Sequence, residues 1–582
     1  VAKPAQSGPH LDHMLALQKV AMVSPQIECD TDHLEIWFEN GTVAPRRGPA
    51  QQPRQRANLV PTSDHIVRVA APAASRNSPG VREVAGNSSP NGQKAQPSAS
   101  GKKNPNDLFS TSGGSGDPFV LTAAKVRVLM IQGPDGQQAE VAFVRADENV
   151  QLTQAHGDAA EPLVVNGNVL EVHNRGEMDQ DMVVLGQPAH VRDRGAHIEG
   201  GRIVFNRLRS TADVEGPGRL QLPVQQTAGN DADAARNRGG EPSQPLDVDW
   251  HQKMHFDGKT AHFFVNVHTS LTDAQSQSEI RCLNMDVTLT KPFSFVQQQQ
   301  PKTEADRPAV ETVFCQGDVE FESQAKQADR SAEVRRGRFM DLLFNNLTGK
   351  STANGPGLLR VWRHNENGQS GIAQFSNVRS NAPPKTRKSS AWEFEQVKFS
   401  GQMNGDFSDL LAGRSGPRPK SAPNVQPTAA SNSLLATSGA WTTVFHDHVE
   451  VIYGPVEQQL ELVTRDELSE EAGCLLCEYL QVTQIPQTTA VPQHIEMLAR
   501  GNAQIEGKTF NGGADTITYD GSKTQTDSLP YVLIGDSAGP ARLWRQVKVG
   551  ATPGTNAANR ISFNPITHKV IEDGAKELNF HQ

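Results

Sequence analysis

Four copies of a short box, written Ile/Leu-x-Phe/Tyr-Asn/Asp, decide how this chain folds. The copies are Ile203-Val204-Phe205-Asn206, Leu342-Leu343-Phe344-Asn345, Ile517-Thr518-Tyr519-Asp520 and Ile561-Ser562-Phe563-Asn564. Alternate side chains of a strand point to the same face, so the first and third residues of each box should share one face. The Asn or Asp that follows can hydrogen-bond the local backbone, which favours a turn. Each box therefore predicts the end of a strand and the turn after it.

A second box, Gly-Pro-Gly/Ala-x-Leu, follows three of these copies. It occupies residues 216–220, 355–359 and 539–543. Proline presets one turn position and removes a backbone donor, while glycine tolerates conformations that most residues avoid. A strand should end at this box and a new one begin. The tripeptide Ile-Glu-Gly also recurs ahead of a box, at 198–200 and 505–507. Short patterns that recur in the same order predict a divergent β repeat.

The composition favours thin β layers over one thick globular core. The chain has 582 residues, of which 36% are hydrophobic and 5% aromatic, with 49 Gly and 37 Pro. This length exceeds what a single core holds, so several modules are expected. We predict an all-β fold of repeated open β-jelly-roll or β-solenoid modules, each with two facing antiparallel sheets, joined by long polar linkers. The net charge of −9 argues against a nucleic-acid partner, because phosphate binding requires a basic surface.

Changes in composition divide the chain into β modules and linkers. Runs rich in Pro, Ser, Asn and Gly indicate linkers, and alternating apolar residues indicate strands. The expected segments are 1–42 (end of a truncated β module), 43–117 (low-complexity linker), 118–223 (β module), 224–248 (linker), 249–378 (β module with an insert), 379–410 (strand pair continuing the stack), 411–439 (linker) and 440–582 (C-terminal β module). Residues 183–191 are predicted to form two short strands around a turn. The composition of the insert at 324–336 is compatible with a short helix.

The sequence contains no recognisable targeting signal or membrane-spanning segment. It begins at Val1 with no methionine and no apolar signal core, so we expect a processed chain or a fragment. No apolar run approaches the roughly 20 residues that span a bilayer. The sequence start therefore leaves the compartment open.

The usual catalytic and metal-binding motifs are absent from the sequence, so we expect no enzyme, no cofactor and no metal site. The best metal candidate is His446-Asp447-His448, since alternate strand residues would put both imidazoles on one face. Without further ligands it is interpreted as a solvated strand face. Asp318, Glu320 and Glu322 likewise read as the wet side of a strand whose other face is apolar.

Five cysteines are expected to act mainly as small buried residues. Cys474 and Cys477 form a lone Cys-x-x-Cys pair, which is a weak zinc signal without a second pair. A disulfide between Cys282 and Cys315 would form if their strands are neighbours and the compartment is oxidising.

Strands with one apolar face, stacked in succession by short turns, make two facing sheets with an apolar interior. If the sheets gape along one seam, the interior is a groove suited to hydrocarbon chains. If they close, it is a core. Alternating apolar residues fit both interpretations.

The boxes and their surroundings resemble the OstA-like proteins of lipopolysaccharide transport, which include the periplasmic bridge protein and the N-terminal domain of its outer-membrane partner. The resemblance lies in residues 183–191, 198–206 and 216–218, and again in 501–520 and 558–565. It implies an open, twisted β-jelly-roll whose inner face holds acyl chains and whose exposed edge strands join end to end. It also implies a periplasmic or cell-envelope location, peripheral to the outer membrane. This chain is several times longer than the bridge protein and carries long polar linkers.

Two hypotheses of different kinds follow. The first is a cell-envelope β-repeat protein that binds or conducts lipopolysaccharide-like lipid through an apolar inner groove, alongside envelope transport proteins. The residues expected to line that groove are Ile203, Phe205, Leu342, Phe344, Ile517, Tyr519, Ile561 and Phe563. The second is a scaffold or surface-assembly protein that polymerises through its exposed β edges without lipid.

Overall fold

In the computed structural model the described residues are strand almost throughout, which confirms the expected all-β fold. The described residues are 12–23, 27–40, 119–132, 139–156, 160–175, 179–193, 195–206, 208–224, 244–272, 276–293, 308–326, 332–364, 392–406, 441–456, 459, 472–485, 494–523, 528–546, 552–565 and 567–579. The expected linkers 43–117 and 411–439 lie outside them. Within this part of the chain the one helical element is a single 3-10 turn, η4 (Gly521–Lys523), and no helix is long and apolar enough to cross a membrane.

The described residues form 26 strands, which belong to one sheet. The N-terminal strands are β1 (His13–Val23), β2 (Ile27–Asn40), β3 (Phe119–Gln132), β4 (Ala139–His156), β5 (Ala160–Asn174), β6 (Gln180–Asp193), β7 (Ala196–Asn206) and β8 (Thr211–Val224). The middle strands are β9 (Gln244–Trp250), β10 (Lys253–Phe256), β11 (Thr260–Thr272), β12 (Ser276–Leu289), β13 (Val310–Lys326), β14 (Ala332–Asn345), β15 (Lys350–Asn354), β16 (Gly357–His364), β17 (Trp392–Phe399) and β18 (Gln402–Asp406). The C-terminal strands are β19 (Trp441–Val456), β20 (Gly473–Ile485), β21 (His494–Gly507), β22 (Phe510–Asp520), β23 (Tyr531–Ile534), β24 (Ala541–Arg545), β25 (Gly554–Phe563) and β26 (Val570–Asn579).

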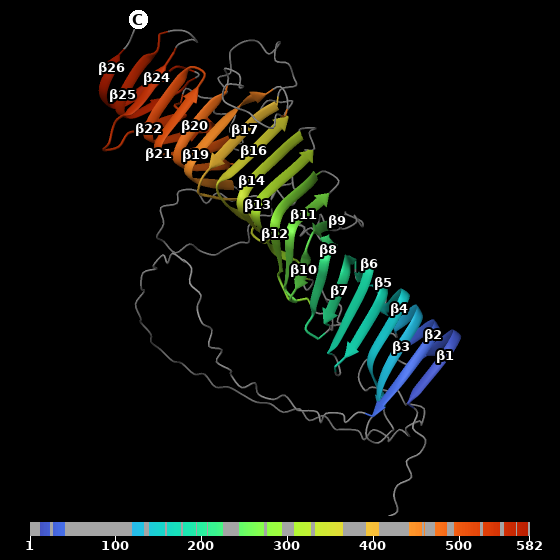
Figure 1. Ribbon diagram of the computed structural model, residues 1–582. Coiled ribbons are helices and arrows are strands. Elements are labelled where there is room, and N and C mark those ends of the chain that lie inside the picture. The colour runs from blue at the N-terminus through green and yellow to red at the C-terminus, as the bar shows by residue number, and fades with distance from the viewer. Residues whose placement is uncertain are drawn as a thin grey trace, which may run out of the picture.

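Strands that follow one another in sequence lie side by side. Figure 1 shows them succeeding one another along a long, narrow stack from β1 at one end to β26 at the other. Neighbours pair antiparallel with one exception, β2 and β3, which run parallel from Ile27↔Phe119 to Asn40↔Gln132. Parallel neighbours need a long crossover, and residues 41–118 provide its length. The expectation of purely antiparallel sheets is therefore wrong at this one pair.

Bulges with left-handed backbone interrupt the long strands near their middles. The residue pairs concerned are Gln18-Lys19 in β1, Glu148-Asn149 in β4, Val265-Asn266 in β11, Gly317-Asp318 in β13, Asp447-His448 in β19 and Gly501-Asn502 in β21. The pairing register shifts at each of these places. A bulge bends its strand, so the two halves of a long strand run in different directions.

Four pairs of short strands act as single bent strands. β9 and β10 both pair with β8 on one side and with β11 on the other. β15 and β16 both pair with β14, β17 and β18 with β19, and β23 and β24 with both β22 and β25. Each pair thus takes the place of one long strand, and the ladder is interrupted completely where a long strand would only bend.

Two of the three Gly-Pro-Gly/Ala boxes separate strands, as the sequence predicts: the second lies between β15 and β16, and the third between β23 and β24. The first box lies inside the single strand β8, so the strand end expected there is wrong. Gly216 has a φ of 85°, which an L side chain rarely adopts. Gly218 lies directly opposite Trp250, whose indole occupies the space where a Cβ would be. In the second box Gly357 stands opposite Phe399 in the same way. The third box has Ala541 at this position, opposite the small Ala558, so a methyl group fits there.

Both halves of each bent strand contribute to one interior. In β4, Ala146 before the bend and Val150 after it are both buried in the same apolar cluster. That cluster continues without a break from Cys29 in β2 to Phe563 in β25. The expected modules therefore share one sheet and this large apolar cluster, beside which Val334, Trp362, Phe394 and Val456 form a second, smaller one.

Three details of the expected organisation are wrong. Residues 183–191 are one strand, β6, bent around Gly186 to Pro188, and not two strands. The expected linker 224–248 ends early, because β9 begins at Gln244. The described parts of the insert at 324–336 extend β13 and β14 and form no helix. Pairing with β12 and β16 overrides the local helix propensity of Ala, Gln, Lys and Glu there.

Candidate functional site

The eight box residues point into the interior. Ile203, Ile517 and Ile561 are 0% exposed, and Leu342, Phe344, Tyr519 and Phe563 are also buried. Phe205 is half-buried and packs against the core from its margin. The sequence thus places all eight on the inner face correctly, and in the structure seven of them are packed core residues.

The turn after each box is capped as the sequence predicts. A backbone N–H two or three residues on donates to the Asn or Asp side-chain oxygen in every copy. The bonds are Arg209 N to Asn206 Oδ1 (2.7 Å), Thr348 N to Asn345 Oδ1 (2.9 Å), Ser522 N to Asp520 Oδ1 (3.1 Å) and Thr567 N to Asn564 Oδ1 (3.2 Å). The caps fix where each strand ends, and so hold the apolar box positions in register with the interior.

The interior is closely packed in the C-terminal part of the stack. The space bounded by Val451, Tyr453, Leu480, Met497 and Ile505 is entirely apolar and has no room for a water molecule. Near the C-terminal end, Phe510, Tyr519, Tyr531 and Phe563 form an aromatic cluster, with the rings of Tyr531 and Phe563 stacked 4.9 Å apart. Burial raises the pKa of Tyr519 and of Tyr531. Both phenols are therefore neutral at physiological pH.

An ion-pair cluster marks one margin of this interior. Arg363 follows Leu359 and Val361 on the inner face of β16. It contacts Glu333 of β14 (3.5 Å) and Glu395 of β17 (3.0 Å), and Arg335 pairs with Glu333 as well. Burial opposes ionisation of Glu333, but the two guanidinium groups outweigh it and lower the pKa of Glu333 to about 2.

All five cysteines are buried free thiols, as expected of small core residues. Cys282 and Cys315 lie on the neighbouring strands β12 and β13, but the disulfide considered for them is not formed. The register places Met285, not Cys282, opposite Cys315. A hydrogen bond with Cys282, together with burial, raises the pKa of Cys315. Burial also raises the pKa of Cys29, to about 11, so the thiols of Cys29 and Cys315 stay protonated and poorly reactive.

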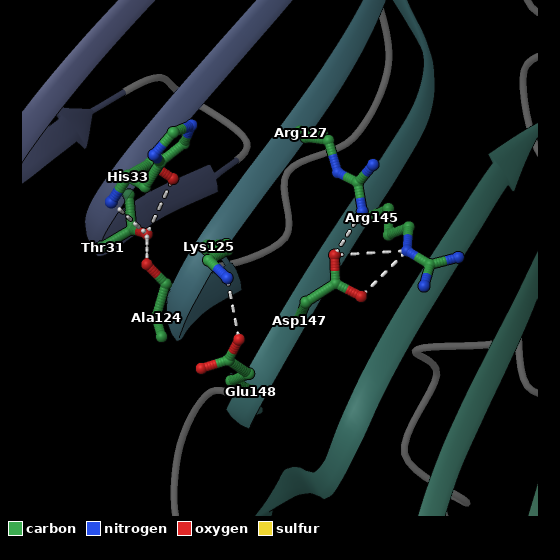
Figure 2. Close-up of polar contacts among 8 residues, drawn as sticks. All are labelled: Thr31, His33, Ala124, Lys125, Arg127, Arg145, Asp147 and Glu148. Carbon is green, nitrogen blue, oxygen red and sulfur yellow. Dashed lines mark hydrogen bonds and ion pairs between the residues drawn. The ribbon is translucent and has the colours of Figure 1, made fainter.

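The outer face near β3 and β4 carries a network of charged side chains (Figure 2). Arg127 and Arg145 both donate to Asp147, at 2.6 and 2.9 Å, and Lys125 pairs with Glu148 at 2.9 Å. All of these residues except Arg145 line a polar surface depression of about 550 Å³ at the bend of β4. Since each charge already has a partner of opposite sign, the network serves to align neighbouring strands.

A hydrogen bond at the bend of β2 stabilises the parallel pair. In Figure 2, the hydroxyl of Thr31 donates to the Ala124 carbonyl of β3 at 3.1 Å. It also accepts from the His33 N–H at 3.3 Å. The Thr31 side chain thus adds a contact between β2 and β3 at the one position, Asp32 and Ala124, that their pairing skips.

A longer row of acidic and basic side chains crosses the outer face of the middle strands, and acids alternate with bases along it except where His268 stands opposite Arg281. The paired residues are, in order from β6 to β14, His190, Glu199, Arg219, Asp249, His268, Arg281, Glu320 and Arg338. Opposite charges directly across a strand pair favour one register, because a slip would bring like charges together. Glu320 and Glu322, which pair with Arg338 and Arg336, lie on the wet face as the sequence predicts.

The structure separates the histidines of the His446-Asp447-His448 motif. Asp447 and His448 have φ values of 63° and 49°, because β19 bends there. The His446 ring packs against Tyr479, whereas His448 approaches Glu478 at 3.6 Å. The expectation that both imidazoles share one strand face is therefore wrong, since the bulge breaks the alternation.

Sequence reasoning missed two groups whose ligand atoms come within 4.8 Å of one another: His190, His197 and Glu199, and His494, Glu496 and Asp520. The first group has a signal in the sequence. Asp193 pairs with Ala196 across a tight turn at Gly195, so the hairpin register follows by counting back from that turn. This counting places His190 opposite Glu199 and puts His197 on the same face.

Comparison with known proteins adds no assignment, since no family model, no curated protein and no solved structure matches this chain.

Proposed function

We propose that this chain binds acylated lipid of the lipopolysaccharide kind along its apolar interior and acts in the cell envelope. The observation that carries the proposal is the unbroken apolar cluster from Cys29 to Phe563, which runs the length of the stack between facing strand halves. An ordinary β sandwich needs only a local core. A core continuous over the described strands offers hydrocarbon chains a path from one end to the other. The resemblance of the boxes to the OstA-like proteins supports the same function.

Lipid would enter by parting the strand halves along the margin opposite their bends. The interior is packed in the absence of lipid, so binding must replace side-chain contacts with acyl contacts. Transfer of each methylene from water contributes about 0.8 kcal/mol, so a chain of a dozen methylenes supplies roughly 10 kcal/mol against the contacts it displaces. Phe205, half-buried at the margin, is the box residue best placed to meet an entering chain.

Photocrosslinking tests this proposal at matched positions. Benzoylphenylalanine would replace Phe205 or Phe344, whose side chains face the interior, and Leu343, which is 39% exposed on the opposite face of the same strand as Phe344. Irradiation in cells that make lipopolysaccharide should attach lipid at Phe205 and Phe344 but not at Leu343. Equal labelling at all three positions, or at Leu343 alone, would rule out an interior lipid path.

A second candidate is a scaffold that assembles through its sheet edges without lipid. Of the described strands, β1 pairs with β2 alone, and its side chains Met14, Leu15, Leu17 and Val23 are exposed. An apolar edge strand is a template for pairing with another chain. Sedimentation of lipid-free protein distinguishes the two. Concentration-dependent polymers that disappear in Leu15→Lys/Leu17→Lys would favour the scaffold, and a monomer would favour the lipid-binding function.

A further inference from the structure

Three side chains with metal-ligating atoms converge on the outer face of the β6–β7 hairpin. His190 lies directly opposite Glu199 in the ladder, and His197 precedes Glu199 by two residues on the same face. Their neighbours Ala189, Val191 and Ile198 point the other way, into the core. Two strands of a rigid hairpin therefore position all three ligands.

The two distances from the Glu199 carboxylate fit a shared cation better than they fit hydrogen bonds. Oε1 of Glu199 lies 3.4 Å from Nδ1 of His190 and 3.5 Å from Nε2 of His197. Hydrogen bonds from ring nitrogens to carboxylates are usually shorter, about 2.7–3.2 Å. By contrast, zinc bonds of about 2.0–2.1 Å give a tetrahedron whose edges are about 3.4 Å. The carboxylate oxygen thus stands at tetrahedral spacing from both nitrogens at once.

Another stacked histidine pair shows what ordinary pairing looks like in the same sheet. His255 and His262 face each other across β10 and β11, with rings 6.1 Å apart. His255 contacts Asp213 at 2.6 Å and His262 contacts Asp286 at 2.8 Å. Each imidazole there has its own carboxylate at hydrogen-bond distance, whereas at the β6–β7 hairpin one oxygen serves two imidazoles.

The neighbouring charges leave the hairpin group available. Arg219, which stands opposite Glu199, contacts Asp247 at 3.0 Å and Asp249 at 3.8 Å. In the other group, by contrast, Asp520 already binds Lys523 at 3.0 Å and accepts from Ser522. In the hairpin group Glu199 contacts the two histidines that would share the ion with it, so coordination there displaces no lysine.

We propose that His190, His197 and Glu199 bind a divalent transition-metal ion of the zinc class. Two imidazole nitrogens and one carboxylate oxygen are ligands that zinc accepts, and three protein ligands leave a fourth position for water or an anionic oxygen. The site lies on the outer face, so it stands independently of lipid binding in the interior. Bound metal would join β6 to β7 and stabilise the hairpin by mass action.

Metal titration of the tag-free, chelator-treated full chain tests the site. ZnCl₂ binding would be followed by calorimetry, and CoCl₂ binding by the visible absorption that distinguishes tetrahedral from octahedral cobalt. The variants are His190→Ala/His197→Ala and Glu199→Gln, with His255→Ala/His262→Ala as the matched control. Circular dichroism establishes that each variant keeps its β structure.

The expected result is one ion per chain in the wild type and the control, with a tetrahedral cobalt spectrum. Loss of even an outer-shell partner typically weakens metal binding 10–100-fold, so loss of direct ligands should weaken it by at least about tenfold in both site variants. Zinc should also raise the melting temperature of the wild type and the control only. Unchanged affinity in the site variants, loss in the control instead, an octahedral cobalt spectrum, or no binding by the wild type would each overturn the proposal.

Discussion

Glu333 shows how a single residue can tie the stability of this protein to pH. Its carboxylate is buried and depends on Arg335 and Arg363 for compensation. The pKa of Glu333 is lowered to about 2 in the folded chain, against about 4.3 in an unfolded one. A lowered pKa contributes stability that is present above the unfolded value. That stability is lost as the pH falls toward the folded value.

We therefore predict that the free energy of unfolding falls by about 3 kcal/mol between pH 5 and pH 2 through Glu333 alone. Glu333→Gln should cost about 3 kcal/mol at pH 7, because it leaves two guanidinium groups without their shared partner, and should flatten this pH dependence. Urea unfolding at several pH values measures both effects. Glu322→Gln is the control, since it removes a partly exposed partner of Arg336 and should cost less than about 1 kcal/mol. Equal effects of the two substitutions would contradict the assignment.

At the same scale, sequence reasoning succeeds where the interaction is local. The caps at Asn206, Asn345, Asp520 and Asn564 join residues two or three apart, so the box alone predicts them. The contact of His190 with Glu199 can likewise be counted back from the tight turn at Gly195, but the contact of Glu333 with Arg363 requires the register of two strands that no tight turn joins. No local pattern shows which residues will stand opposite one another across separate strands.

The bends of the long strands are the elements that turn a flat meander into two facing layers. Most of the residues at the bends are polar or glycine, which tolerate positive φ comparatively well. Val265 in β11 is the exception, with a φ of 66°. A β-branched side chain is strained in this region of φ, ψ space.

Val265→Asn should therefore increase the free energy of unfolding by about 1 kcal/mol, since asparagine adopts left-handed backbone far more readily. The same substitution two residues on, Val267→Asn, should destabilise the protein by more than about 2 kcal/mol, because Val267 is 1% exposed and ordinary in backbone. Chemical denaturation of both variants checks the opposite signs. A loss of stability in Val265→Asn would show that the bend is not strained.

The bends also mark where element prediction from sequence fails. Glu148-Asn149 and Asp447-His448 read as polar residues within strands, because nothing local distinguishes a solvated strand position from a left-handed one. At the Gly-Pro boxes, by contrast, the sequence predicts the bend, because glycine and proline have strong backbone preferences. Residues 183–191 were expected as two strands because a bend and a turn share the same glycine and proline signals.

At the scale of the whole molecule, the consecutive pairing makes the stack nearly one-dimensional. Each described strand pairs only with strands close to it in the strand order, so a local defect should open nearby strands and leave distant ones protected. The sequence predicts repeats and modules, but it does not predict that the modules share one continuous sheet. The composition of a linker shows where strands stop, but it does not show whether the strands on its two sides pair with each other.

Hydrogen exchange measured by mass spectrometry can test this. Ile203→Ala should cost about 2–5 kcal/mol and raise exchange in β6, β7 and β8 while β20 to β22 stay protected. Ile517→Ala, equally buried in the parent chain, should give the mirror image, raising exchange in β21 and β22. Uniformly faster exchange throughout the chain in both variants would mean that the stack unfolds as one cooperative unit.

The central claim, an interior that takes acylated lipid, is tested most directly by what the purified chain carries. The full chain would be isolated from cells that make lipopolysaccharide, extracted with organic solvent and examined by mass spectrometry, alongside Phe205→Asp. We predict acylated lipid in near-stoichiometric amount from the wild type, and its loss from a variant that retains its β circular dichroism. Lipid-free wild-type protein with intact β structure would contradict the claim and leave the apolar interior as a structural core.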